Sequence, residues 1–454
     1  MKIQSINPAT EEVNGEFELS TKEHALNVLK ATRKAWEEWK TVDVSDRAKR
    51  MRNLATALRK KKAEYARLIT IEMGKPIKQS LAEIEKCAWA AEIYADNGAR
   101  WLEDERIDAG YKKSFVAFEP LGVVLSIMPW NFPFWQALRF GIPAITAGNA
   151  TILRHSNNVP MCAYAIEEAF KEAGFPENLF RSLLTDHDTV KALIKHKSIK
   201  GVSFTGSTEV GKGIANLAGK NLKKCVLELG GSDPFIVLED TNMSFTCAAA
   251  VEGRNISDGQ SCIAAKRFIV VKDAATDFIA HFTELMSQYV LGDPLDQETD
   301  EGPLSSKKQL EKLESQVADA VRRGARIETG GKRPRMKGYY YEPTVLTHDK
   351  MGSRILTEEV FGPVAPIIVV KDANDAIRVA NSTEYGLGAS IWTSDLEKAE
   401  NIARQIEAGN VFINSIVKSD PMLPFGGIKA SGIGRELSRY GLLEFVNMKS
   451  IAIK

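Results

Sequence analysis

The first hundred residues show apolar positions at helical spacing. In residues 44–77 apolar side chains recur every three or four positions, and Gly-Lys-Pro at 74–76 ends the pattern. Ser45 stands at the start of this pattern and is a candidate N-cap. The basic side chains of the same segment are expected to form a solvated helix surface. We therefore predict that this part of the chain is mainly helical.

From Pro120 onward, short apolar runs alternate with amphipathic segments. The runs are typical of buried strands, whereas residues 162–174 between them have helical spacing. Strands separated by helices at this interval imply right-handed crossovers and a parallel sheet. The expected strands lie within 121–130, 148–155, 200–207, 225–231 and 233–238.

A second alternation begins near residue 266 and predicts a second α/β unit. Its expected strands lie within 266–271, 366–370, 389–393 and 410–414, and its helices within 274–290, 373–386 and 395–409. We expect the two units to meet near 227–231, with a cleft between them. Residues 112–120 and 444–454 alternate weakly, as edge strands do, and are expected to pair with each other or across a subunit interface.

Length and charge narrow the class of protein. A chain of 454 residues exceeds one ordinary core and suggests two or three domains. With 60 basic and 59 acidic residues, no overall field favours nucleic acid or anionic lipid, so neither is expected as a partner. The first twenty residues lack the apolar core of a secretory signal, and no apolar run reaches the roughly 18 to 20 residues that span a bilayer. We expect a cytoplasmic protein.

The cysteines and histidines do not show metal or disulfide spacing. Five cysteines form no C-x-x-C pair, and six histidines form no H-x-x-x-H pair. We expect neither a disulfide framework nor a metal site. Cys262 has a distinct setting, because it follows the turn-prone stretch SDGQS and precedes a predicted strand. Loops on rigid scaffolds often present nucleophiles, although a free cysteine is more commonly a small buried apolar residue.

Three further stretches carry residues that suit chemistry. FTGSTEVG at 204–211 predicts a strand, a turn and a helix beginning near Thr208, an arrangement that binds phosphates, although Thr208 replaces the middle glycine of the dinucleotide fingerprint. Glu228 beside a glycine pair could act as a general base or form a structural cap or salt bridge. Asn131 in PWNFP could stabilise an oxyanion or serve as a turn residue.

Together these stretches resemble the NAD(P)-dependent aldehyde dehydrogenase superfamily over essentially the whole chain. The matching stretches, in the family's order, are INPAT, PWNFP, FTGSTEVG, LELGGSDPFIV, GQSC, EEVFGPV and PFGGIKASGIGRE. Within the superfamily the chain is most similar to succinate-semialdehyde dehydrogenases. The resemblance implies an α/β fold with a Rossmann-type cofactor domain (1–110 and 129–228), an α/β catalytic domain (229–417) and a small β oligomerisation extension (111–128 and 418–454).

The resemblance also implies a mechanism. Cys262 would attack the aldehyde carbon, and the Asn131 amide and the Cys262 backbone N–H would hold the resulting oxyanion. After hydride transfer to a nicotinamide, Glu228 would activate the water that hydrolyses the thioester. Retention of these three residues argues against a non-catalytic scaffold, and the cofactor residues argue against a cofactor-independent thiol esterase.

The family pattern assigns cofactor contacts as well. It places Trp130 in the cofactor groove, Ser207 near the pyrophosphate, Glu359 at the nicotinamide ribose and Phe361 beside it. Arg154 stands where the family usually has lysine, and Asn157 where it often has a glutamate that repels the 2′-phosphate of NADP. We therefore expect both NADP and NAD to be accepted. The alternative is that Arg154 only replaces the lysine in contacting ribose hydroxyls.

The substrate is expected to be a small carboxylated aldehyde, most similar to succinic semialdehyde. Arg139 stands where the succinate-semialdehyde group carries a carboxylate-binding arginine, and Ser419 matches a substrate-contacting serine. Some relatives carry a second arginine where this chain has Ile256, which leaves lactaldehyde, other small aldehydes or glyceraldehyde 3-phosphate as alternatives. Arg139 could instead form a salt bridge. The resemblance implies a homodimer or homotetramer.

Overall fold

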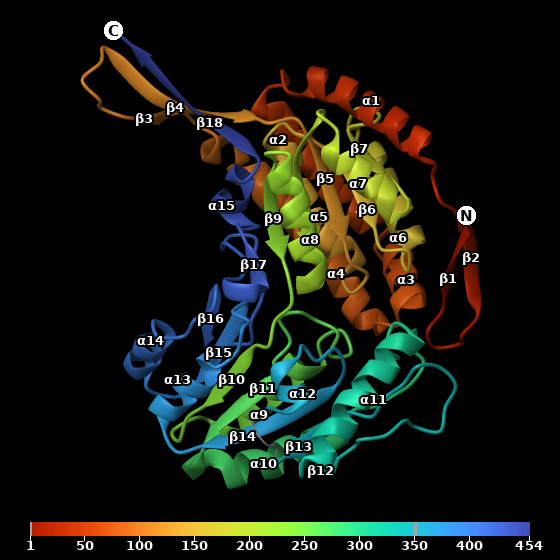
Figure 1. The fold of residues 1–454 in the computed structure, drawn as a ribbon, viewed down its shortest axis with the longest axis vertical. Coiled ribbons are helices and arrows are strands. Elements are labelled where there is room, and N and C mark those ends of the chain that lie inside the picture. The colour runs from red at the N-terminus through yellow and green to blue at the C-terminus, as the bar shows by residue number, and fades with distance from the viewer. Residues whose placement is uncertain (1, 349–351) are drawn as a thin grey trace.

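The computed structural model describes residues 2–348 and 352–454, and the first alternation of apolar runs and amphipathic segments forms one of its sheets (Figure 1). The last run of that alternation, 233–238, is an exception, because it lies in the second sheet as β10 (Pro234–Val237). Its strands run in the order β17-β9-β8-β5-β6-β7, and all neighbours are parallel except β17 and β9. The crossovers between parallel strands pass through helices, as predicted. The bounds are β5 (Val123–Met128), β6 (Ala150–His155), β7 (Phe180–Ser182), β8 (Ile199–Thr205), β9 (Lys224–Glu228) and β17 (Gly432–Ile433).

Helices cover this sheet, and one of them is buried along its whole length. Every residue of α5 (Pro133–Thr146) is buried, and α4 packs on α2, α3 and α5. Such a helix is apolar around its circumference, which matches its sequence. The other helices are α1 (Lys22–Trp39), α2 (Val44–Lys60), α3 (Lys62–Met73), α4 (Ile77–Trp101), α6 (Pro160–Glu172), α7 (His187–Lys195) and α8 (Thr208–Lys220).

Two details of the N-terminal region differ from the prediction. The chain begins with an antiparallel hairpin, β1 (Lys2–Ile6) and β2 (Val13–Glu18), before its first helix. The N-cap of α2 is Asp43 and not Ser45, because the Asp43 carboxylate accepts hydrogen bonds from the Ser45 backbone N–H and hydroxyl at 2.8 and 2.7 Å. Gly74 ends α3 in the left-handed conformation at φ 91°, as the Gly-Lys-Pro stop predicted.

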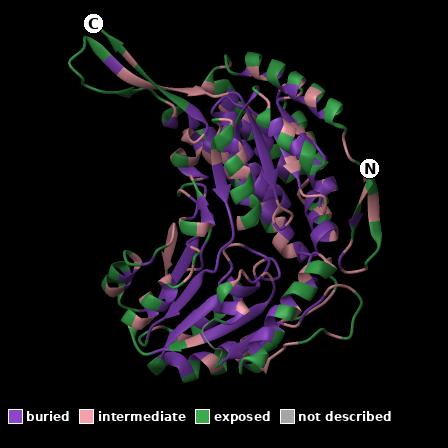
Figure 2. Ribbon diagram, in the orientation of Figure 1, coloured by how far each residue is buried: buried purple, intermediate pink, exposed green. Residues whose placement is uncertain are grey.

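The second alternation forms another sheet, in the order β12-β13-β14-β11-β10-β15-β16. All neighbours are parallel except β12 and β13. The strands are β10 (Pro234–Val237), β11 (Arg267–Val271), β12 (Arg326–Thr329), β13 (Thr344–Thr347), β14 (Val364–Val370), β15 (Gly388–Trp392) and β16 (Asn410–Ile413). The helices are α9 (Met243–Asn255), α10 (Lys272–Ser287), α11 (Lys307–Arg322), α12 (Arg354–Thr357), α13 (Ala373–Asn381) and α14 (Leu396–Ala403). Buried residues fill the interior of both units (Figure 2).

A third, smaller sheet projects from the body and ends at the C-terminus (Figure 1). It pairs β4 (Lys113–Pro120) with β18 (Val446–Ile453) in an antiparallel register from Lys113–Ile453 to Pro120–Val446, and β3 (Glu105–Arg106) flanks β4. The predicted pairing of these two edge segments is confirmed. Helix α15 (Ser438–Leu443) leads into β18. Within the described residues, no helix is long and apolar enough to cross a membrane.

Candidate active site

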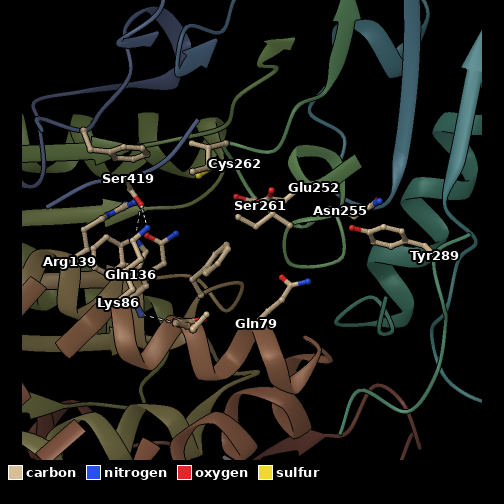
Figure 3. A pocket seen from close by; sticks show the side chains of 17 residues that line it. Gln79, Lys86, Gln136, Arg139, Glu252, Asn255, Ser261, Cys262, Tyr289 and Ser419 are labelled. Carbon is tan, nitrogen blue, oxygen red and sulfur yellow. Dashed lines mark hydrogen bonds between the residues drawn. The ribbon is translucent and has the colours of Figure 1, made fainter. Parts of the chain in front are cut away.

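A cavity of about 330 Å³ lies where helices of the first unit face loops of the second. Helices α4 and α5 provide one wall, and the end of α9, the loop before β11, Tyr289 and the segment after β16 provide the others. Among the residues predicted from the sequence, Cys262, Arg139 and Ser419 line it (Figure 3). Ile256 also contributes to the wall, so the position of the second arginine in some relatives is apolar here. Cavities of this size are typical of small-molecule sites.

A strained turn carries the nucleophile candidate to this cavity. After α9 ends, Ser257, Asp258 and Gly259 all adopt positive φ, at 55°, 57° and 67°. A Cβ on Gly259 would lie 2.3 Å from the Gly362 backbone, so only glycine fits this close approach. Consecutive residues in this conformation are costly and persist where the surrounding structure fixes them. The turn therefore sets the position of Cys262 three residues later.

Buried Lys266 fixes the backbone of the same loop from behind. Its ammonium donates hydrogen bonds to the carbonyl oxygens of Ser261 and Cys262 at 2.8 and 2.6 Å. Holding the Cys262 carbonyl in this way orients the peptide groups around the thiol. The sequence interpretation did not single out Lys266, although it lies four residues after Cys262.

The thiol itself is half-buried and protonated at neutral pH. Burial raises the pKa of Cys262 to about 12, although the positive charges of Arg139 and Lys266 act in the opposite direction. The shift is thus opposite to that of a preformed thiolate. A nucleophilic role requires that a base accept the thiol proton during attack.

Asn131 lies beside the nucleophile loop, as the sequence predicted, and is buried. Its side-chain Nδ2 donates to the Gln260 backbone carbonyl at 2.9 Å, and its backbone carbonyl accepts from the Ser257 hydroxyl at 3.2 Å. An amide nitrogen carries two hydrogens, so one remains available after the bond to Gln260. The side chain is therefore held rigidly with a donor in reserve, which suits stabilisation of an oxyanion.

Glu228 ends β9 as a buried carboxyl group, and neither of its oxygens has a hydrogen-bond partner among the described residues. Burial raises the pKa of Glu228 well above its usual range; Glu436 raises it further, whereas Arg139 opposes the shift. A carboxyl group with a raised pKa can accept and return a proton near neutral pH. Gly426 keeps this space open, because a Cβ there would lie 2.7 Å from the Glu228 Oε1 atom.

Arg139 of α5 forms the salt bridge that was one alternative weighed for it from the sequence, and it also faces the cavity. It forms a buried ion pair with Glu436 and lies 4.7 Å from the centre of the Phe425 ring. It also lines the cavity, and its Nη2 atom has no hydrogen-bond partner within the part of the chain that the structure describes. The guanidinium is therefore structural on one side and offers a donor on another. Glu436 and Phe425 belong to the stretch PFGGIKASGIGRE, but the sequence interpretation assigned them no role.

Ser419 joins two side chains that sequence reasoning missed. Its hydroxyl oxygen accepts hydrogen bonds from Lys86 Nζ at 2.8 Å and from Trp135 Nε1 at 3.0 Å. Lys86, Arg139 and Ser419 lie together on one side of the cavity, with the Cys262 sulfur near them (Figure 3). Lys86 belongs to a helix with several exposed charged residues, so its sequence setting gives no sign of this position.

None of the residues expected to bind the cofactor lines this cavity. Ser207 is the N-cap of α8, but its side chain makes no capping bond within the described chain, which leaves the helix N-terminus open. Such an end carries free N–H groups and a partial positive charge, and both favour a phosphate. Glu359 accepts a hydrogen bond from the Gly231 N–H at 2.9 Å, and Gly231 in turn approaches the Cys262 carbonyl.

The remaining predicted cofactor residues form two pairs. Trp130 and Phe361 make an edge-to-face contact with ring centres 6.3 Å apart. Arg154 lies near the end of β6 and donates to the Asn157 side-chain oxygen at 3.2 Å and to the Thr185 carbonyl at 3.3 Å. Its Nε atom is buried without a partner among the described residues. Because these acceptors are neutral, the charge of Arg154 remains available to a phosphate. The set fits a dinucleotide.

The described residues contain no group of three His, Cys, Asp or Glu side chains that could hold a metal ion. All five cysteines, each of them within the described residues, are unpaired.

Comparison with known proteins gives one consistent result. The family model for the aldehyde dehydrogenase family matches residues 1–451. A probable succinate-semialdehyde dehydrogenase [NADP(+)] of Synechocystis is 43% identical over 453 residues, with 100% of both chains covered. The succinate semialdehyde dehydrogenase [NAD(P)+] of Escherichia coli is 42% identical, covering 98% of this chain and 97% of its own. The structure of succinic semialdehyde dehydrogenase from Streptococcus pyogenes with NADP+ matches at a TM-score of 0.97 and 36% identity, covering 99% of each chain.

Proposed function

This chain belongs to the aldehyde dehydrogenase family, and we propose that it oxidises succinic semialdehyde to succinate with NADP+ or NAD+, using Cys262 as the nucleophile. One observation carries the proposal: the cavity places a thiol close to a serine and two cationic side chains, which suits an aldehyde with a carboxylate at its other end. The named relatives support this substrate and both cofactors.

The first step is covalent capture of the aldehyde. A bond forms between the Cys262 sulfur and the carbonyl carbon, and the carbonyl oxygen becomes an oxyanion. The remaining Asn131 amide hydrogen and the Cys262 backbone N–H donate to that oxygen, and one such donor typically lowers the barrier by about 2.7–4 kcal/mol. Since the thiol is protonated, its proton must leave during attack. Solvent water accepts that proton, so Glu228 stays available as the base for the later hydrolysis.

The cofactor residues orient the second step. When bound, the nicotinamide ring supplies a hydride acceptor. The open end of α8 at Ser207 would hold the pyrophosphate, Glu359 a ribose, and Trp130 and Phe361 the apolar surface of the groove. Cys262 then carries a thioester. Glu228 takes a proton from water as that water attacks the acyl carbon, and the S–C bond breaks to release the acid. General-base catalysis of this kind typically accelerates the reaction about 10²–10⁴-fold.

The cofactor preference follows from charge at the end of β6. Within the described chain no carboxylate pairs with Arg154, and Asn157 beside it is neutral. A 2′-phosphate would therefore meet a guanidinium that is not in an ion pair, although the charge of Asp186 also acts on Arg154. We propose that NADP+ is used at least as well as NAD+.

The substrate carboxylate is proposed to bind Arg139 and Ser419. The experiment is to measure kcat/KM for succinic semialdehyde, butanal, lactaldehyde and glyceraldehyde 3-phosphate, each with both cofactors. Butanal is the matched control, because it has the same chain length without the charge. Since hydrogen bonds to charged groups contribute about 1.5–3 kcal/mol, succinic semialdehyde should be favoured over butanal by at least about tenfold. Equal values for the two would reject the substrate assignment.

We further propose that the sheet of β3, β4 and β18 assembles the chain into a homodimer or homotetramer. Ile107, Tyr111, Met448 and Ile453 expose apolar side chains on this projecting sheet, which supports an interface. Light scattering of the purified protein tests this, and a monomer would reject it. A cytoplasmic location is proposed as well, supported by the unpaired cysteines.

A further inference from the structure

A second cation faces the substrate cavity from α4. Lys86 lines the cavity, its Nζ donates to the Ser419 hydroxyl at 2.8 Å, and it lies 4.3 Å from the centre of the Trp135 ring. Figure 3 shows Lys86 beside Arg139 and Ser419, on the side of the cavity away from Tyr289. A lysine held at a wall by Ser419 and Trp135 has a defined position, unlike an extended surface lysine.

No carboxylate neutralises this ammonium group. Among the described residues, no carboxylate oxygen lies within 4.0 Å of Lys86 Nζ. Glu83, one turn earlier on the same helix, is engaged elsewhere: it pairs with Lys75 and accepts hydrogen bonds from the backbone N–H groups of Phe134 and Trp135 at 2.9 and 3.0 Å. The Glu436 carboxylate is paired with Arg139. The cavity therefore holds a net positive charge on this side.

In the free protein, the positive charges of Lys86 and Arg139 repel each other. Burial lowers the pKa of Lys86 to about 8, and the positive charge of Arg139 lowers it further, whereas Cys87, Glu83 and Asp420 act weakly in the opposite direction. An anion bound between Lys86 and Arg139 would relieve both the lost hydration and the mutual repulsion. A substrate carboxylate supplies that anion.

The hydrogen bonds that Ser419 accepts determine that its hydroxyl group can only donate to a ligand. A hydroxyl group accepts at two lone pairs and donates one hydrogen. Lys86 and Trp135 both donate to the Ser419 oxygen, and the hydroxyl hydrogen has no acceptor within the described residues. The remaining hydrogen is thus free for an acceptor in the cavity. Lys86 in this way turns Ser419 into a donor, which matches a carboxylate and not an ammonium or a neutral alkyl end.

We propose that Lys86 is a specificity-determining residue that binds the substrate carboxylate together with Ser419 and Arg139. Some relatives carry a second arginine where this chain has Ile256. Here Lys86 of α4 supplies the second positive charge. This inference rests on the proposed function and deepens it. The ligand class it defines is a short aldehyde with a terminal carboxylate.

The test compares Lys86→Met and Lys86→Arg with a matched control. Lys78→Met makes the same change on the same helix, at a lysine paired with Asp300 and outside the cavity wall. The readout is the ratio of kcat/KM for succinic semialdehyde to that for butanal. We expect Lys86→Met to lower this ratio about 10–100-fold, mainly through a higher KM for the acid, whereas Lys86→Arg retains most of it and Lys78→Met retains all of it.

A pH profile of the same ratio separates charge from packing. The ratio cancels groups that act on both substrates, which include Cys262 and Glu228. Because Lys86 loses its charge as pH rises through about 8, the wild-type ratio should fall from pH 7 to pH 9. The Lys86→Arg ratio should stay level over that range. Glu252 and Tyr289 also line the cavity, and burial raises the pKa of Tyr289 above this range.

The outcomes distinguish the two claims. If the wild-type kcat/KM for succinic semialdehyde is close to that for butanal, the proposed substrate itself is wrong. A high wild-type ratio that survives in folded Lys86→Met would overturn the role of Lys86 and leave the substrate assignment standing. If Lys86→Met does not fold, the pH profiles of wild type and Lys86→Arg decide, and a level wild-type profile overturns the inference. Binding of succinate, measured by calorimetry on wild type and Lys86→Arg, should be tight in both below pH 8.

Discussion

Replacing Arg139 with methionine should destabilise the fold through the carboxylate that the guanidinium leaves behind. Arg139 and Glu436 are 2% and 3% exposed, and the Glu436 carboxylate otherwise accepts only one long hydrogen bond described in the structure, from Ser203 at 3.3 Å. Breaking a buried ion pair on one side typically costs about 3–5 kcal/mol, because the other charge stays buried and unpaired. We expect a loss of that size in the free energy of unfolding for Arg139→Met.

The same structure predicts rescue by a second substitution. Arg139→Met/Glu436→Gln removes both charges and leaves a neutral amide near Ser203. Replacing a whole buried pair with neutral groups is often nearly free of cost. The double variant should therefore recover most of the stability that the single variant loses, although it lacks the Arg139 donor in the cavity. Its selectivity for succinic semialdehyde over butanal should remain low.

The pH dependence of this effect has a definite sign. In the native protein burial raises the pKa of Glu436, and Arg139 opposes that rise. Without Arg139 the folded-state pKa rises further, so above pH 4.5 the folded protein binds a proton that the unfolded chain has released. Stability then falls as pH increases, by up to about 1.4 kcal/mol per pH unit, until the folded-state pKa is passed. Arg139→Met should be less destabilised at pH 5.5 than at pH 8.

The assay is urea-induced unfolding at pH 5.5 and pH 8, followed by intrinsic fluorescence and circular dichroism. Wild type, Arg139→Met, Glu436→Gln and the double variant complete the cycle. Equal destabilisation of Arg139→Met at both pH values, or a double variant no more stable than the single one, would refute the buried-charge explanation.

Three further predictions concern the chemistry. Asn157→Glu should lower kcat/KM for NADP+ at least about tenfold relative to that for NAD+, because a carboxylate beside Arg154 repels a 2′-phosphate. The control Asn157→Gln should leave this ratio unchanged. If steady-state assays show the same NADP+ to NAD+ ratio for Asn157→Glu as for wild type, the charge explanation is wrong. Glu228→Gln should retain a first-turnover burst of reduced cofactor in stopped flow, but its steady-state rate should fall about 10²–10⁴-fold. Loss of the burst with a normal rate of hydrolysis would contradict the role of Glu228 as the base in hydrolysis. Because burial raises the pKa of Cys262 to about 12, the rate of its alkylation by iodoacetamide in the free enzyme should increase about tenfold per pH unit from pH 7 to pH 10. Peptide mass spectrometry follows the reaction, and a rate that reaches a plateau below pH 9 would contradict the raised pKa.

The alternating apolar runs were sufficient to predict the two α/β units and most of their strands, but not the short strands β7, β12, β13 and β17. Runs such as 233–238 and 266–271 are buried on both faces, so their sequence carries a strong signal, and they form β10 and β11. The hairpin of β1 and β2 was missed because its side chains are mainly exposed and polar, which leaves little alternation to detect. Asp43 and Ser45 are both good caps, and the structure selects Asp43 by local geometry.

The site was predictable where sequence position and chemistry coincide. Cys262 follows a turn-prone stretch, and the structure places it at the cavity. Its raised pKa depends on burial by residues far apart in the chain, which the sequence does not show. Lys86 is the clearest case: it lies among exposed charges on α4, and only the packing of α4 against α5 turns it toward Ser419.

The central claim is that the sulfur of Cys262 bonds to the substrate carbon. Peptide mapping by mass spectrometry of Glu228→Gln, quenched during reaction with succinic semialdehyde and NADP+, tests it most directly, because slow hydrolysis lets the acyl group accumulate. The expected result is one succinyl group on the peptide that contains Cys262. A succinyl group on Cys87, Cys162, Cys225 or Cys247, or turnover with no acylated peptide, would contradict the account.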